Sequence, residues 1–177
     1  MITFLNKEQI DNTIEIIAQQ LLLVAHTAPK GKGIDTLSIC MLDGEDKNKL
    51  ATEMEKIANA QDLDFFARDA ENIRTSSTVI LLGTNSSVRG LNCGYCGHQL
   101  CSSKPKNQPC TFNTIDLGIA IGAVASAAIN YKLDNRIMFS AGRAAKELNF
   151  FDENTQIIFA IPLSASAKNI FFDRIKK

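Results

Sequence analysis

Tryptophan is absent from the 177-residue chain, and neither sign of charge is in excess. Lysine and arginine total 19, as do aspartate and glutamate, so composition gives no electrostatic reason to expect a nucleic acid or an anionic membrane as partner. The segment Met1 to Lys7 has no basic region followed by an apolar stretch, so we expect no secretory signal. We therefore expect a cytoplasmic protein, in which cysteines remain thiols.

Long apolar runs are also missing. The most apolar segment, Ile115 to Ile129, is shorter than the ~18–20 residues that cross a bilayer, and it contains Asp116. It predicts a buried core helix and no membrane span. The chain also lacks a Gly-x-Gly-x-x-Gly segment, a P-loop and any grouping that marks a nucleophilic triad. Catalytic residues therefore stay unassigned.

The chain does contain the pattern of one globular domain over residues 1–177. Hydrophobic residues make up 45% of it, and its length favours a single core. Apolar spacing predicts helices over 6–28, 46–59, 64–74, 113–131 and 143–149, and strands over 34–42, 78–82, 137–140 and 156–161. Helices and strands interleave, which favours a three-layer α/β or α+β domain.

Four of the five cysteines lie in one loop, which we place at residues 84–112 between a strand and the central helix. The spacing is Cys93-x2-Cys96-x4-Cys101-x8-Cys110, and the Cys-x2-Cys turn directs two sulfurs to one side, with Gly94 and Gly97 relieving the strain of that turn. Four thiolates suit an iron–sulfur cluster or zinc. We therefore predict that these four cysteines bind one metal site.

Other interpretations of the loop stay open. Two disulfides would conflict with a reducing compartment, and four unrelated thiols so close in sequence are hard to assign to chance. Spacing alone does not separate zinc from iron. His98 could replace a cysteine on zinc or be a solvated loop residue, and Lys104 and Lys106 could offset thiolate charge or simply face solvent. Cys40 lies in an apolar strand and is interpreted as a core residue.

The central helix carries Gly118, Gly122 and Ser126 four residues apart on one face. Each glycine costs about 1 kcal/mol of helix propensity relative to alanine, so we expect something to approach that face closely. Another helix of the same chain, a second subunit and a flat cofactor are the three candidates. The second of these predicts a homodimer.

A second candidate cofactor segment is the turn that contains Pro29, Lys30 and Lys32. The two lysines could meet a phosphate, or they could complement the end of the preceding helix. Near the C-terminus, Ser164, Ser166 and Lys168 give a weaker signal of the same kind.

Several segments together resemble an uncharacterised prokaryotic family described as containing a ferredoxin domain. They cover nearly the whole chain, and the cysteine loop and the C-terminal segment are the most specific. The segments are Thr27–Asp35, Arg68–Asn72, Gly90–Cys96, Asp116–Ala120, Asp134–Met138, Ile161–Ala165 and Lys168–Asp173. This resemblance favours an iron–sulfur cluster over zinc, and we expect the [4Fe–4S] type.

More distantly, the order of elements is similar to that of the FMN-dependent nitroreductases. Those proteins also have a long first helix, an Ala-Pro turn entering a strand, a small-residue central helix and a late strand ending in proline. The resemblance implies an α+β fold of three layers, with a mixed sheet flanked by helices, and a dimer with FMN at the subunit interface. Their arginine-rich N-terminal flavin signature is not found before Asn6, so the resemblance itself transfers no FMN contact.

Three hypotheses of function follow. The first is an electron-transfer protein whose four-cysteine loop carries an iron–sulfur cluster, with a flavin near the glycine-bearing helix and a redox partner protein. The second is a non-enzymatic domain whose loop holds a structural zinc. The third is a flavin reductase in which the cysteine loop is incidental.

Overall fold

The computed structural model describes residues 4–172, so Asp173 of the C-terminal matching segment lies outside the described residues. The helices are α1 (Lys7–Thr27), α2 (Gly44–Gln61), α3 (Asp64–Thr75), α4 (Thr111–Asn130) and α5 (Phe139–Glu147). The strands are β1 (Leu37–Leu42), β2 (Thr78–Asn85), β3 (Asp134–Asn135) and β4 (Thr155–Ser164). Two short 3-10 turns are η1 (Gly31–Gly33) and η2 (Cys101–Ser103).

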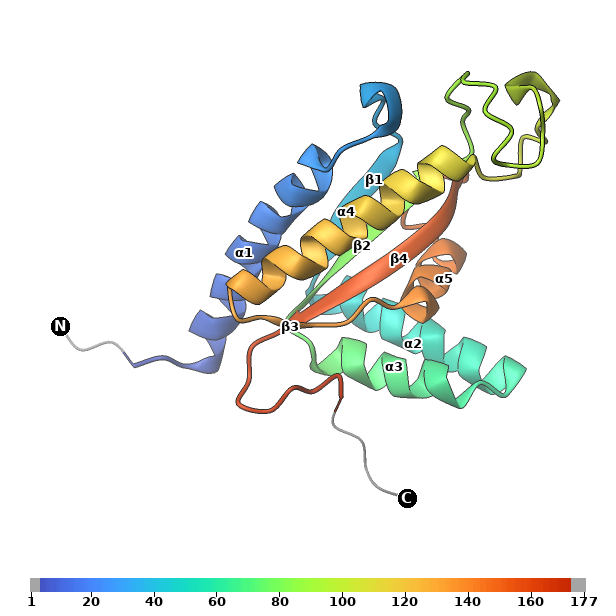
Figure 1. Cartoon of the computed structure of the whole chain (residues 1–177). Helices are drawn as coiled ribbons and strands as arrows, with labels where there is room; N and C mark the ends of the chain where they lie inside the picture. The colour runs from blue at the N-terminus through green and yellow to red at the C-terminus, as the bar shows by residue number, and fades with distance from the viewer. Residues whose placement is uncertain (1–3, 173–177) are drawn as a thin grey trace.

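Three layers form the domain, with α1 and α4 on one face of the sheet and α2, α3 and α5 on the other (Figure 1). Strand β2 shows why: Val79 and Leu81 belong to the core beneath α2, α3 and α5, whereas Ile80 and Leu82 belong to the core beneath α1 and α4. Side chains alternate across a strand, so a strand that is apolar at every position must be covered on both faces. The predicted three-layer α+β architecture is confirmed.

The sheet has the order β1-β2-β4-β3, and each of its strand pairs is antiparallel. The prediction of a mixed sheet is therefore wrong, because the sheet is antiparallel. The physical reason is the connection between β1 and β2. It contains two helices, α2 and α3, so the chain returns to the end of the sheet that it left and Leu42 pairs with Val79. A single crossover helix would have produced a parallel pair.

The predicted strand over 137–140 is also wrong. Met138 forms only an isolated bridge with Ala160, and α5 begins at Phe139. This helix lies directly on β4, because a Cβ atom at Gly142 would sit 1.9 Å from the carbonyl oxygen of Ile158. Small residues at the contact face therefore allow tertiary packing to override a short apolar pattern.

Helix α1 begins as its sequence predicts. The Asn6 side chain accepts a hydrogen bond from the Gln9 amide at 2.9 Å, and the Gln9 side chain accepts one from the Asn6 amide at 3.0 Å. This reciprocal capping box satisfies two N–H groups that a helix start otherwise leaves unpaired.

Helix α4 is only partly the buried core helix that its composition predicts. One face packs into the core beneath α1, through Leu117, Ala120, Ile121, Val124 and Ala128. The opposite face is open, and a Cβ atom at Gly118 or Gly122 would meet nothing within 4 Å. Length and composition alone would let α4 cross a membrane, but core helices of globular proteins pass the same test. Within residues 4–172, close packing does not explain these glycines.

Candidate metal centre

The cysteine loop lies at the end of the sheet where β2 stops and α4 starts, well clear of the two helical layers (Figure 1). Cys110 is the N-cap residue of α4 and is buried, whereas Cys93, Cys96 and Cys101 are partly buried. All four are free thiols, and none is in a disulfide. The disulfide interpretation of the loop is therefore not what the structure contains.

The first half of the loop is built on left-handed backbone positions. Gly94 and Gly97 have φ values of 74° and 87°, and the Gly97 amide donates to the Gly94 carbonyl at 2.9 Å. Cys96 therefore lies within a tight turn. Its two left-handed positions, Gly94 and Gly97, are ones that glycine adopts without strain. Tyr95, in the same turn, stacks on Phe112 of α4 with ring centroids 5.9 Å apart.

Asn92 connects this turn to Cys101. The backbone amide of Asn92 donates to the Cys101 sulfur at 3.4 Å, and the side-chain oxygen of Asn92 accepts from the backbone amide of Cys101 at 2.8 Å. Hydrogen bonds to a cysteine sulfur are one way in which a protein stabilises thiolate and adjusts the potential of a metal bound to it.

The second half of the loop is held by the side-chain amide of Gln108 and by the ammonium of Lys104. Gln108 donates to the Cys96 carbonyl at 2.9 Å, and its amide oxygen lies 2.9 Å from Nε2 of His98. That ring nitrogen of His98 is therefore engaged by an amide. Lys104 is buried, and its ammonium donates to backbone carbonyls, including that of Ser86 at 3.0 Å.

The donor types fit a thiolate-bound metal, although the ligands are not gathered into one cluster. Within residues 4–172, no three His, Cys, Asp or Glu side chains are grouped so that they could hold a metal ion. Cys110 is the N-cap residue of α4, so the helix fixes the position of its backbone. The four-cysteine site therefore stays a prediction. If a metal binds, Cys93, Cys96, Cys101 and Cys110 would hold it.

The fifth cysteine is different in kind. Cys40 packs against the core beneath α2, α3 and α5, as its apolar strand predicts. Burial raises the pKa of its thiol to about 11, because an apolar environment disfavours the charged thiolate. Cys40 is therefore a core residue with a poorly reactive sulfur.

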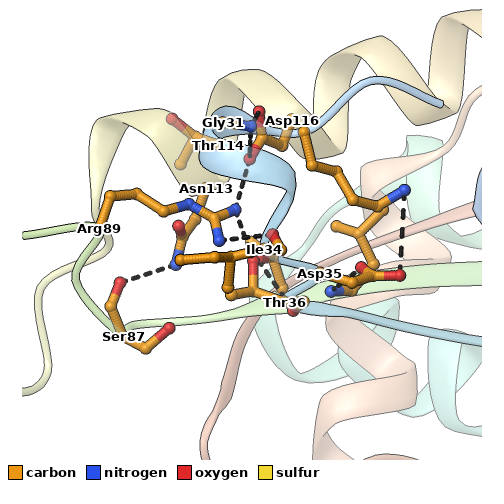
Figure 2. A network of polar contacts seen from close by, with 12 residues as sticks. Gly31, Ile34, Asp35, Thr36, Ser87, Arg89, Asn113, Thr114 and Asp116 are labelled. Atoms are coloured by element: carbon orange, nitrogen blue, oxygen red, sulfur yellow. Dashed lines mark hydrogen bonds and ion pairs between the residues drawn. The ribbon is translucent and has the colours of Figure 1, made fainter.

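A buried polar network joins the two ends of the loop to the rest of the domain (Figure 2). Arg89, just before the first cysteine, forms an ion pair with Asp116 of α4, and their side chains are 1% and 4% exposed. Arg89 also donates to the Ile34 carbonyl and to the Thr36 hydroxyl. The Asp116 carboxylate accepts the Gly31 amide through both oxygens, at 3.0 and 3.1 Å.

Asn113 of α4 makes a second connection at the same place. Its amide nitrogen donates to the carbonyls of Asn85 and Ser87 at 3.0 and 2.8 Å, which ties α4 to the end of β2. Among the described residues, Nε of Arg89 and Oδ1 of Asn113 are the buried side-chain atoms without a hydrogen-bond partner. The network is therefore extensive but not fully satisfied.

Sequence reasoning missed this network. The central helix was predicted to start at Asn113, but α4 starts at Thr111, so Asp116 lies in its second turn and faces η1. Arg89 lies in a polar stretch with no periodicity, and its partners come from segments 27 to 55 residues away. No local signal could have identified it.

The predicted cofactor residues do not converge on one site. The Lys30 ammonium donates to the carbonyls of Ala25 and Ala28 at 3.1 and 2.9 Å, which matches the alternative of a lysine complementing the helix end. Lys32 donates to the Arg89 carbonyl at 3.3 Å, while Pro29 is exposed beside it. Lys168 follows β4, whose end at Ser164 lies at the opposite end of the sheet from the turn that contains Lys30 and Lys32.

Comparison with known proteins supplies the family context. The model of the family described as "Uncharacterized protein containing a ferredoxin domain" matches residues 106–174. An uncharacterized protein from Archaeoglobus fulgidus is 38% identical, with 98% of each chain covered.

Solved structures share the fold. Nitroreductase A from Vibrio parahaemolyticus aligns with 94% of this chain at 16% identity and a TM-score of 0.58. The NADPH:FMN oxidoreductase from Vibrio harveyi, in complex with NAD+, aligns with 96% at 14% identity and a TM-score of 0.57. The chain spans only 61% and 64% of these two proteins. The predicted nitroreductase-like fold is confirmed.

Proposed function

Because the chain belongs to the family of uncharacterized proteins containing a ferredoxin domain, we propose that it is a redox protein whose cysteine loop binds an iron–sulfur cluster. Cys93, Cys96, Cys101 and Cys110 are the proposed ligands, and the [4Fe–4S] type is the expected cluster. When bound, such a cluster accepts and donates single electrons. The observation that carries the proposal is four free thiols in one loop.

The surroundings of the thiols support this assignment. The Asn92 amide donates to the Cys101 sulfur, and the N-terminus of α4 adjoins Cys110. Hydrogen bonds to a ligand sulfur are a recurring feature of metal-bound cysteines in proteins. The ion pair between Arg89 and Asp116 holds the start of the loop against α4, where the loop ends. The two ends of the loop therefore stay close together when the cysteines bind a metal.

A flavin and a second subunit form the finer part of the proposal. The open face of α4 carries Gly118 and Gly122, and exposed apolar side chains surround it: Ile115 and Ile119 are 46% and 41% exposed. Leu23, on the outward side of neighbouring α1, is 64% exposed. An apolar face of this kind supports a homodimer. FMN between the subunits is part of the proposal because FMN oxidoreductases share the fold, and a redox protein that supplies electrons completes it.

Structural zinc is the second candidate function for the loop. Between β2 and α4, the described chain has η2 as its only regular element, and long loops of that kind usually need a staple. Four thiolates suit zinc as well as iron. On this alternative the protein is a non-enzymatic domain.

Metal analysis of anaerobically purified protein tests the proposal. We expect brown protein with about four iron and four sulfide per chain and visible absorption that bleaches with dithionite. Cys93→Ser and Cys110→Ser should lose the iron, whereas Cys40→Ser, the matched control, should keep it. Colourless protein without iron after anaerobic reconstitution would refute the iron–sulfur assignment, and one zinc per chain would favour the structural alternative.

A further inference from the structure

A cleft of about 530 Å³ opens between the end of β2 and the cysteine loop. Cys101, one of the proposed ligands, lines it. Three serines also line it, two from the segment after β2 and one beside Cys101: Ser86, Ser87 and Ser102. Its volume lies in the range of sites that bind small molecules, about 300–1,000 Å³.

The charge that lines this cleft has one sign. Its charged side chains are Lys104 and Lys106, and in the part of the chain that the structure describes no carboxylate lines it. Its other polar side chains are hydroxyls and amides, which can donate hydrogen bonds to an anion. The chain as a whole is neutral, so this local excess of positive charge is a property of the cleft.

Lys104 adds a second, independent observation. It is only 8% exposed, and its ammonium donates to the carbonyls of Ser86, Pro105 and Gln108. Among the described residues no carboxylate pairs with it. Its three protons are satisfied, but its charge is not balanced, and burying an unbalanced ammonium is costly. An anion bound in the cleft would therefore be attracted by the positive potential of Lys104.

We propose that the cleft binds a small anion carrying a carboxylate or phosphate group. Lys106 and the serine hydroxyls contact the anion, and buried Lys104 contributes its positive potential without a hydrogen bond. Binding of the anion needs no metal. Because Cys101 lines the cleft, the bound anion would lie beside the cluster as a substrate or effector of the redox protein. This role of the anion rests on the proposed function.

Titration of inorganic phosphate and of succinate into ¹⁵N-labelled protein at constant ionic strength tests the proposal. Metal-free and zinc-loaded protein are both diamagnetic and suit the measurement. We expect saturable shifts of the amides of Ser86, Ser87 and Ser102, and the tighter of the two probes identifies the chemical class. Loss of one charge-assisted hydrogen bond predicts that Lys106→Gln weakens binding about tenfold or more.

The control is Lys7→Gln. Lys7 is exposed at the start of α1 and forms an ion pair with Asp11. Asp11 accepts a hydrogen bond from Ser77, which comes just before β2, at the end of the strand away from the cleft. Lys7→Gln should leave the affinity unchanged. Shifts that do not saturate, or an equal affinity in Lys106→Gln, would overturn the proposal. Anion binding that persists in Cys93→Ser protein lacking metal would support the cleft even if the iron–sulfur assignment failed.

Discussion

The ion pair between Arg89 and Asp116 should be among the most sensitive points of the fold. Arg89→Met removes the guanidinium but keeps much of the volume, and it leaves the Asp116 carboxylate buried with the Gly31 amide as its remaining hydrogen-bond donor. Removing one partner of a buried pair typically costs about 3–5 kcal/mol, because the remaining charge is uncompensated. For a domain of this length, about 3 kcal/mol lowers the Tm by about 6–12 °C.

The coupling between the two residues is the sharper measurement. Asp116→Asn keeps an oxygen that can accept the Gly31 amide, so the double variant Arg89→Met/Asp116→Asn has neither charge. We therefore expect the double variant to be clearly more stable than the sum of the two single losses predicts. Urea unfolding of the four proteins gives this coupling energy.

A surface pair provides the matched comparison. Arg74 and Glu55 also form an ion pair, at 2.7 Å, but their side chains are 33% and 43% exposed. Arg74→Met should cost about 1 kcal/mol or less, because water screens exposed pairs. The reasoning is refuted if Arg89→Met costs no more than Arg74→Met, or if the two substitutions at Arg89 and Asp116 are simply additive.

Three further predictions concern the thiols and the glycines. The raised pKa of Cys40 predicts that iodoacetamide at pH 8.5 labels it last of the five cysteines in metal-free protein, as mass spectrometry would show. The free energy of unfolding should also fall between pH 9 and 11, because the thiol ionises in the unfolded chain before it ionises in the folded one. Cys40→Ala should remove that fall. Gly142→Ala should cost about 3 kcal/mol or more in urea unfolding or prevent soluble expression, because its Cβ would overlap the Ile158 carbonyl; an unchanged midpoint would contradict the packing of α5 on β4. Gly118→Ala and Gly122→Ala meet open space, so each should raise helix stability by up to about 1 kcal/mol in the monomer while weakening the proposed dimer in sedimentation equilibrium; equal dimer affinity would place the interface elsewhere.

Local patterns in the sequence were enough to predict most of the helices and the central strand. The apolar spacing of α1 and the unbroken apolar run of β2 each report burial that neighbours in sequence already determine. The strand predicted over 78–82 continues to Asn85, where β4 still pairs with it. Strand ends depend on the partner strand, which a local pattern does not contain.

The candidate site was predictable in its chemistry and not in its supports. Cysteine is scarce and reactive, so four in one loop are visible without a structure. Arg89 and Asp116 are ordinary charged residues, and only the fold brings them together with Gly31. The turn lysine Lys30 was ambiguous for the same reason, since its partners were decided by how the chain leaves α1.

The hydrogen bonds from Asn113 to Asn85 and Ser87 have a consequence for how such a chain can change over time. These contacts join the strand and the helix on either side of the cysteines, and they use no residue between Gly90 and Cys110. The two hydrogen bonds of Asn113 therefore hold this joint without help from the thiols, although Lys104 and Tyr95 of that segment add contacts to Ser86 and Phe112. Changes in the length or the side chains of the segment between Gly90 and Cys110 therefore leave these two hydrogen bonds in place, so that such a segment can be exchanged without redesigning the sheet beneath it.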